Sequence, residues 1–380
     1  MRRLWGMIAD YFRETDKVLL FLCTCASLYG SMMVLSTTRY TGSSRAFFVQ
    51  LAAIAIGIAA AVMMSVTFDY NTIVKWWMIP AAIALILVGL TFIIGYAPGG
   101  TDDKAWIKLP FGMSFQPSEL LKIAFIITFA KHVSLLGERV NSILNIIALC
   151  IHGAVPVMLI HIQGDSGTAL VLGIIFLSMM FAAGIRMRYF VIAGVFAALA
   201  APVTWFFIMN DDQRDRIETL LNPELDLYGT GWQQWRARIA MANGGFFGKG
   251  YLKGDFVQKG GVPEGHNDFI FASTGEELGM LGLIAVIALL LAICIRILVI
   301  AHHAKDKQGV IICSGIFGML AAQMILNIGM CVSLLPVIGI TLPFFSAGGT
   351  SLVATFLGIG LVLNVYNHRN LRPMYLRDDF

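Results

Sequence analysis

The sequence predicts an all-α polytopic membrane protein with about ten transmembrane helices. Of its 380 residues, 58% are hydrophobic and only 13% are charged, whereas a soluble globular protein carries about 25% charged residues. Apolar runs recur from one end of the chain to the other, and a run of about 18 or more residues is long enough to cross a bilayer as a helix. The alternating pattern of barrel strands does not accompany these runs. Most of the surface is therefore expected to face lipid.

Polar breaks between the runs place the elements in order. The eighth run is long enough to tilt or to extend beyond the lipid. Residues 210–268 form one large loop, whose amphipathic stretch Trp232–Met241 predicts an ordered piece at the membrane surface. A single membrane domain is expected to cover residues 1–380. The ten spans are predicted near 17–37, 46–66, 73–95, 118–136, 143–162, 167–185, 188–209, 269–299, 308–333 and 346–366.

Lysine and arginine are distributed unequally between the two sides of the predicted membrane. Fifteen fall in the segments on the side of the N-terminus, and four fall in the short loops on the other side. The positive-inside rule therefore places both termini in the cytoplasm and the large loop outside. The first apolar run lacks a small-residue cleavage site and is typical of a signal anchor.

The segment Val262–Ala272 is the most informative stretch of the chain. It places Glu264, His266 and Asp268 in a polar turn that leads directly into a long apolar helix. Ionisable groups at a membrane boundary are costly to hold and are a functional-site hypothesis by default. If the chain is an enzyme, we expect the chemistry at this turn, with Asp268 as the first candidate.

Two more polar segments are predicted on the same side. Ser118 is a candidate cap for the helix that begins near Glu119, and Glu119 and Lys122 share a helix face because they are three residues apart. A self-neutralising pair and a polar cavity wall both fit them. Asp165 precedes another apolar run, where a helix-capping role and a role in a site are both open.

One further segment is expected to have irregular backbone. Prolines and glycines interrupt the chain between residues 334 and 349, and broken backbone at membrane depth survives only when it is buried in protein or lines a cavity. A packed re-entrant turn and direct substrate contact are equally open there.

In the large loop, basic residues beside aromatics fit either an anionic lipid head group or the acidic residues of the same loop. The six cysteines form no CxxC pair and are expected to be buried thiols.

With these segments in view, the chain resembles the SEDS family (shape, elongation, division and sporulation). The resemblance rests on five motifs in the family's order, and together they span nearly the whole membrane domain. The sequence departs from the family pattern at several positions, among them Ala105, where an arginine is usual, and Asn267, where a threonine is usual. The motifs are Trp106 with Gln116-Pro117-Ser118-Glu119 and Lys122, Asp165 with Gly167-Thr168-Ala169, the block Pro263–Ala272 followed by Gly275–Gly279, Asn327–Met330, and Leu342–Gly349.

The resemblance implies a peptidoglycan glycosyltransferase of the bacterial cytoplasmic membrane that polymerises lipid II at the outer face. Asp268 matches the family's essential aspartate and would act as general base. The diphosphate leaving group needs positive charge, from loop arginines or from a divalent cation, Mg²⁺ or Mn²⁺; no organic cofactor is implied. Candidate metal ligands are Asp268, Glu264 and Asp165. Candidate residues of the substrate cavity are Trp106, Lys108, Gln116, Ser118, Glu119, Lys122, Asp165, Glu264, His266 and Ser346.

The expected partners are lipid II, membrane lipid and a class B penicillin-binding protein, the transpeptidase that crosslinks the new glycan; nucleic acid is not expected. Short tails favour an elongation role over division. Two alternatives from other classes remain. A lipid II flippase also needs ionisable groups in a membrane domain, and a scaffold that only recruits the transpeptidase needs no base at Asp268.

Overall fold

The structure, a computed structural model, describes residues 15–67, 69–97, 104–109, 113–221 and 229–369. Arg2, Arg3, Arg13, Arg372 and Arg377, which count in the orientation argument, lie outside these ranges. The described chain is nearly all helical, with one short hairpin of strands β1 (Ile107–Leu109) and β2 (Met113–Phe115). The helical elements are α2 (Lys17–Thr38), η1 (Arg39–Thr41), α3 (Arg45–Thr67), α4 (Tyr70–Lys75), α5 (Met78–Ile94), α6 (Pro117–Leu136), η4 (Gly137–Asn141), α7 (Ile143–Ile162), α8 (Ser166–Ala182), α9 (Met187–Val203), η5 (Thr204–Ile208, a π-helix), α10 (Asp211–Leu221), α11 (Thr230–Gly244), η7 (Val257–Lys259), α12 (Ile270–His302), α13 (Lys307–Cys331) and α14 (Gly349–Asn367).

Ten apolar helices of the described chain overlap the ten predicted spans. Eight are long and apolar enough to cross a membrane by length and composition, and α5 and α8 are shorter apolar helices of 17 residues each. The fold class predicted from composition is therefore confirmed. The last span begins at Gly349 rather than at residue 346, because the backbone before it is irregular.

The prediction of one continuous third span over residues 73–95 is wrong. The chain instead forms the six-residue α4, whose first turn is capped by Asp69, and resumes as α5 at Met78. Trp76 and Trp77 lie at the break and are 59% and 36% exposed. Indole rings favour the water–lipid interface, so the break marks the end of the apolar span.

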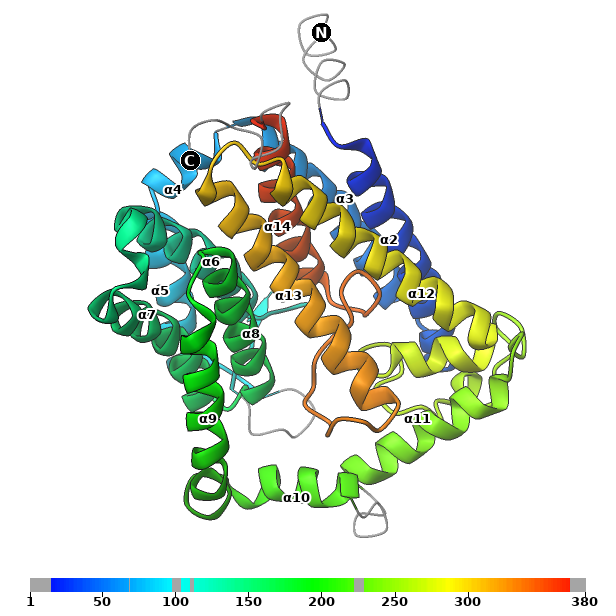
Figure 1. The fold of residues 1–380 in the computed structure, drawn as a ribbon. Coiled ribbons are helices and arrows are strands. Elements are labelled where there is room, and N and C mark those ends of the chain that lie inside the picture. Colours follow the sequence, from blue (N-terminus) through cyan, green and yellow to red (C-terminus); the bar gives the residue numbers. More distant parts are fainter. Residues whose placement is uncertain (1–14, 68, 98–103, 110–112, 222–228, 370–380) are drawn as a thin grey trace, which may run out of the picture.

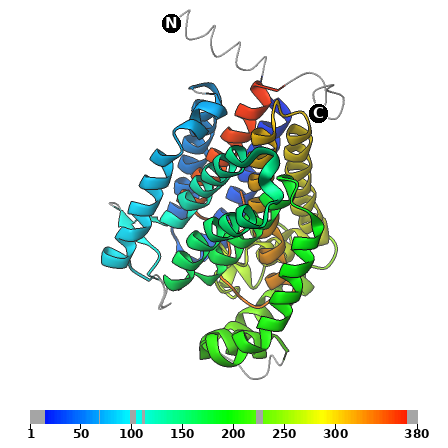
Figure 2. The ribbon, with the colours of Figure 1, turned by 60° about the vertical axis from the view of Figure 1, so that its left-hand side comes forward.

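Helix α13 is the centre of the bundle (Figures 1 and 2). It packs against α8, α12, α6, α14 and α11, and most of it is buried. Small residues allow neighbouring helices to approach it closely: Gly315 faces Ile126 of α6, and Gly318 faces Ser178 of α8. Such small-residue contacts are the usual basis of helix packing in lipid, where the hydrophobic effect gives little drive.

The two ends of the bundle differ in character. We call the end that holds the start of α2 and the end of α14 the termini end, and the opposite end the loop end (Figure 1). At the termini end, Nε of Arg296 donates to the buried carboxylate of Asp16 at 2.8 Å, and the Tyr70 hydroxyl donates to Asp306 at 2.8 Å. Helices α10 and α11 lie across the loop end.

The large loop is ordered where it packs against a break in α12. Gly279 has φ of 65° inside this helix, and the loop backbone forms hydrogen bonds on both sides of the break. Glu276 accepts the N–H groups of Phe256 and Val257, each at 2.8 Å. Glu277 accepts the Ser36 hydroxyl at 2.6 Å and is fully buried. The amphipathic stretch predicted to be ordered forms α11, which packs against α12.

Replacing Gly248 with alanine should destabilise this packing strongly. A Cβ at Gly248 would lie 2.2 Å from the Glu277 carbonyl oxygen, and its φ is +82°. Gly245 also has positive φ, +56°, but a Cβ there meets nothing within 4 Å. We therefore expect Gly245→Ala to cost about 1 kcal/mol for the backbone conformation and Gly248→Ala clearly more. Thermal unfolding in detergent measures both, and equal losses would contradict the close approach.

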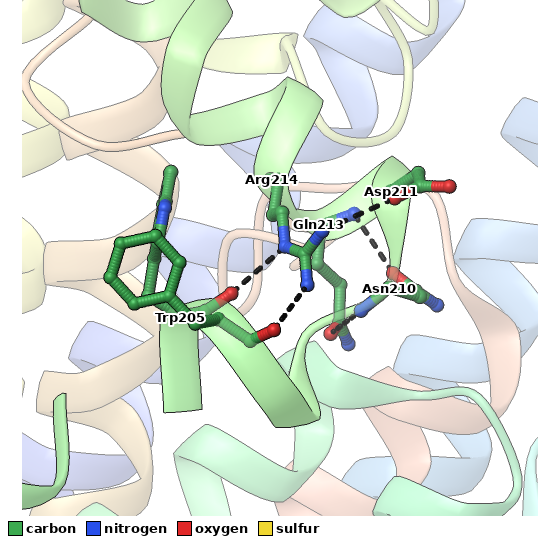
Figure 3. A network of polar contacts seen from close by, with 6 residues as sticks. Trp205, Asn210, Asp211, Gln213 and Arg214 are labelled. Atoms are coloured by element: carbon green, nitrogen blue, oxygen red, sulfur yellow. Dashed lines mark hydrogen bonds and ion pairs between the residues drawn. The ribbon is translucent and has the colours of Figure 1, made fainter. Parts of the chain in front are cut away.

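Helix α9 is held mainly at its ends. None of its residues is buried, and its main contacts are with η5, its own continuation. Arg214 of α10 binds the end of η5 by donating to the carbonyls of Trp205 at 2.9 Å and Phe206 at 3.2 Å (Figure 3). Gln213 donates to the Ser166 hydroxyl at 3.0 Å, so α10 joins the end of α9 to the start of α8.

Candidate active site at the loop end of the bundle

The acidic turn, residues 262–269, lies immediately before α12. Glu264 has φ of 46°, a left-handed conformation that a residue with a side chain rarely adopts. Its carbonyl accepts the N–H groups of Asn267 at 2.9 Å and Phe269 at 3.1 Å. Its exposed carboxylate accepts Nδ2 of Asn267 at 2.8 Å. Left-handed backbone of this kind concentrates at functional sites, which makes this turn the first candidate.

Asp268 is enclosed by the protein but keeps part of its surface exposed. Its Oδ2 faces Gly339, where a Cβ would lie 3.8 Å away. Burial raises the pKa of Asp268 to about 7, and the negative charge of Glu264 is the second cause. The ordinary value for aspartate is about 3.9. A partly exposed carboxyl that ionises near neutral pH has the properties of a general base.

The re-entrant segment, residues 332–348, contains no helix or strand and holds the acidic turn in place. The Ser346 hydroxyl donates to the Asn267 carbonyl at 2.7 Å, and the Ala347 N–H donates to the His266 carbonyl at 2.8 Å. From α3, Gln50 donates to the Ser346 carbonyl at 3.0 Å. The broken backbone predicted here is confirmed, and its observed contacts are those of a packed turn.

A second polar cluster is formed by Gln116, Glu119, Lys122 and Asp165. The Asp165 carboxylate accepts the Thr168 N–H at 2.8 Å, as the cap of α8, and also accepts Nε2 of Gln116 at 2.9 Å. Lys122 is 1% exposed and donates to Glu119 at 2.9 Å. Burial raises the pKa of Asp165, while the Thr168 hydrogen bonds and the charge of Lys122 oppose this rise. The capping role of Asp165 is therefore observed, and its role in a substrate site stays a prediction.

Residues 338–340 of the re-entrant segment lie between the acidic turn and the second cluster. Gly339 faces the Asp268 carboxylate on one side, and the Ile338 carbonyl lies against Gly167, the residue two positions after Asp165, on the other. A Cβ at Gly167 would lie 2.5 Å from that carbonyl. One irregular segment thus connects two carboxylates that are 103 positions apart in the chain.

Trp106 and Lys108 lie in the hairpin, where their observed partner is Tyr96. The Tyr96 N–H donates to the Trp106 carbonyl at 2.9 Å, and Nζ of Lys108 lies 4.7 Å from the Tyr96 ring centroid. Lys108 is exposed. No contact of either residue with Asp268 or Asp165 is present in the described part of the chain, so their role in the cavity stays a prediction.

The two remaining candidates lie beside the clusters. His266 lines a small hollow together with Thr37 of α2, Tyr40 of η1 and Ser273 of α12. Ser118 does not cap α6 with its side chain, because this helix begins at Pro117 and Gln116 occupies the cap position. The expectation of a Ser118 cap is therefore wrong. Its buried hydroxyl has no hydrogen-bond partner within the described ranges.

Sequence reasoning missed two residues that hold this end together. Gln50 binds the re-entrant segment. Gln234 of α11 donates to the carbonyl of Met330 in α13 at 3.0 Å and to that of Leu335 in the re-entrant segment at 2.8 Å. Each is a buried amide. A polar side chain inside an apolar span signals a tertiary partner, which could have drawn attention to Gln50, but the sequence does not say which partner.

The candidate metal ligands do not form a protein metal site. Asp268, Glu264 and Asp165 are distributed over the two clusters, and the described residues contain no group of three or more His, Cys, Asp or Glu side chains that could hold a metal ion. Mg²⁺ is commonly held by only one or two carboxylates together with substrate phosphates and water, so a divalent cation at Asp268, Glu264 or Asp165 stays a prediction.

Comparison with known proteins identifies the family of the chain. A family described as cell cycle protein, with a model named for FtsW, RodA and SpoVE, matches residues 16–371. The chain is 33% identical to a probable peptidoglycan glycosyltransferase FtsW of Geobacter sulfurreducens over 373 residues, which cover 95% of this chain and 97% of that protein. It is also 33% identical to the peptidoglycan glycosyltransferase MrdB of Escherichia coli over 292 residues, 77% and 78% of the two chains.

Solved structures share the fold. The crystal structure of the rod shape determining protein RodA of Thermus thermophilus aligns with a TM-score of 0.68 at 24% identity, covering 93% of this chain and 97% of that one. A chain from work on structural coordination of polymerization and crosslinking by a peptidoglycan synthase complex aligns with a TM-score of 0.81 at 24% identity, covering 94% and 99%.

The fold and the site define a polytopic helical membrane protein with a carboxylate centre at its loop end. The chain belongs to the FtsW, RodA and SpoVE family, which is the SEDS family whose motifs its sequence carries. The resemblance drawn from those motifs is therefore confirmed.

Proposed function

We propose that this chain is a peptidoglycan glycosyltransferase that polymerises lipid II at the outer face of the cytoplasmic membrane, with Asp268 as general base. The observation that carries the proposal is the position of Asp268 together with its raised pKa. Asp268 is enclosed but partly exposed, it lies on a turn that the re-entrant segment holds through Ser346 and Ala347, and its pKa is raised to about 7. Relatives that match most of the chain are named peptidoglycan glycosyltransferases, which supports the reaction class.

The proposed reaction is one inverting transfer. The 4-hydroxyl oxygen of the acceptor sugar forms a bond to the anomeric carbon of the donor, and the bond from that carbon to the diphosphate oxygen breaks. Asp268 takes the hydroxyl proton, and the undecaprenyl diphosphate leaves with the bonding electron pair. Lys122 is already paired with Glu119. The compensating positive charge is therefore assigned to the basic residues of the large loop rather than to this buried lysine.

The unequal distribution of basic residues supports the proposed outer location. Outside the large loop, the described segments at the termini end carry ten lysine and arginine residues and the short segments at the loop end carry four, which favours a cytoplasmic position for the termini end. The loop end with Asp268 would then face outside, where lipid II is used. Cysteine labelling with a membrane-impermeant reagent tests this placement: a cysteine introduced at exposed Lys108 should react in intact cells, and one at Lys305 should not.

The proposed partner is a class B penicillin-binding protein, and the proposed duty is elongation of the cell wall. A chain of similar fold belongs to a peptidoglycan synthase complex that coordinates polymerization and crosslinking, which supports a crosslinking partner. Relatives of comparable identity include both FtsW and MrdB proteins. Complementation of cells depleted of RodA, or of FtsW, decides the duty. We expect growth as rods in the first case only.

The activity is tested with purified protein and labelled lipid II, alone and with its transpeptidase. Glycan polymer on a gel is the expected product. The same protein in vesicles that contain fluorescent lipid II gives the alternative outcome, because a flippase would move the lipid across the bilayer without forming polymer. Neither product from a folded, partner-bound protein would favour a scaffold.

The polymerisation rate should rise with pH and level off above about pH 7. The base acts in its ionised form, and its pKa is raised to about 7, so the ionised fraction falls tenfold for each pH unit below that value. Glu264→Gln removes the charge that is the second cause of the raised pKa, and should move this acid limb to lower pH. A rate that stays constant between pH 5 and pH 8 would contradict the assignment.

A further inference from the structure

The side-chain amide of Asn327 joins the acidic turn to the re-entrant segment. Asn327 lies in α13, four residues before its last residue, and is fully buried. Its Nδ2 donates to two backbone carbonyls, that of Asp268 at 2.8 Å and that of Ile340 at 2.6 Å. Both hydrogens of the amide group are thereby used. The two carbonyls belong to segments that are 72 residues apart in the chain.

These two hydrogen bonds fix the surroundings of the Asp268 carboxylate. Ile340 directly follows Gly339, the residue that faces Oδ2 of Asp268. The Asn327 amide therefore sets the distance between the backbone of Asp268 and residues 339–340, which lie beside the Asp268 carboxylate. The Cys331 thiol, one helical turn later in α13, also lies 3.6 Å from the Asp268 carbonyl. Helix α13 is the best buried candidate span, so it provides a rigid reference.

We propose that Asn327 is a positioning residue of the glycosyl transfer, which holds Asp268 and residues 338–340 in the arrangement that the transfer requires. The inference rests on the proposed function. Asn327 touches neither the carboxylate of Asp268 nor an open surface, so its effect acts through the placement of the base. Misplacing a reacting group by about 1 Å can cost a factor of about 100 in rate.

A second buried asparagine provides the matched control. Asn364 of α14 is also fully buried and binds backbone at the termini end: its Nδ2 donates to the Met64 carbonyl at 2.8 Å, and its Oδ1 accepts the Tyr70 N–H at 2.8 Å. It joins α14 to α3 and α4, far along the helices from the acidic turn. Loss of a buried amide with such contacts is destabilising in both places, but only Asn327 lies beside the proposed base.

The experiment measures melting temperature, kcat and KM for lipid II in wild type, Asn327→Ala and Asn364→Ala. We expect similar drops in melting temperature for the two variants. Only Asn327→Ala should lower kcat, by about tenfold or more, with KM within about threefold of wild type because no substrate contact is removed. A kcat near wild type in folded Asn327→Ala, or an equal loss of kcat in Asn364→Ala, would overturn the proposal.

A second variant covers the case in which Asn327→Ala cannot be purified. Ser346→Ala removes the hydrogen bond to the Asn267 carbonyl from the other side of the same turn. It should also lower kcat, because it loosens the acidic turn from the re-entrant segment; a wild-type kcat would show that the transfer does not depend on how these two segments are held, and would overturn the proposal. The failure of the proposed function looks different, because wild-type protein would itself form no polymer.

Discussion

Asp268→Asn should abolish polymerisation and leave the protein folded. The substitution keeps the size and shape of the side chain but removes the group that accepts the proton. Loss of a general base typically lowers the rate by about 10² to 10⁴. Because the ionised carboxylate is disfavoured where it sits, as its raised pKa shows, a neutral amide should not lower the melting temperature. The measurement is polymer formed from labelled lipid II at matched protein concentrations, together with the melting temperature.

Asp255→Asn is the matched control for this result. Asp255 lies in the same large loop, and its carboxylate is 72% exposed, 4.0 Å from Lys259. The same chemical change there should leave polymerisation unchanged. An Asp268→Asn protein that is folded, binds its transpeptidase and polymerises at more than a tenth of the wild-type rate would contradict a role as base. Equal loss in both variants would point to a general effect of loop charge.

Lys122→Met should be the most destabilising of the substitutions considered. The Lys122 and Glu119 side chains are 1% and 6% exposed, with Nζ and Oε1 2.9 Å apart. Removing one partner leaves the other as an uncompensated buried charge, which costs about 3 to 5 kcal/mol. The double variant Glu119→Gln/Lys122→Met removes both charges, and should regain much of this loss, because the effects of residues in direct contact do not add. Melting temperature and yield after purification measure both.

The exposed pair of Lys259 and Asp255 is the control for the buried pair. Lys259 is 79% exposed, so Lys259→Met should leave the melting temperature unchanged. A Lys122→Met protein as stable as wild type would contradict the buried pair. The double variant also separates the two interpretations of Glu119 and Lys122. If it is stable and active, the pair only neutralises itself; if it is stable and inactive, the pair forms part of the substrate cavity.

The ten spans could be predicted because the membrane imposes a local rule. Each span must be apolar over most of its length and must satisfy its own backbone hydrogen bonds, and both requirements are visible within about 20 consecutive residues. The acidic turn was found by the same logic, since Glu264, His266 and Asp268 are ionisable groups next to the long apolar run that becomes α12. The break at Trp76 and Trp77 was missed, because aromatic residues keep the hydropathy high where the helix ends.

The sequence by itself determined the fold class, the order of the helices and the identity of the candidate base. Only the tertiary structure decided that Gln116 binds Asp165, 49 residues away, and that Asn327 holds the backbone of Asp268, 59 residues away. It also decided that the re-entrant segment lies between the two carboxylates. Span positions depend on hydropathy, a property of neighbouring residues, whereas these contacts depend on how distant helices pack. The sequence shows that an amide side chain is present, but which carbonyl it binds depends on how the helices pack.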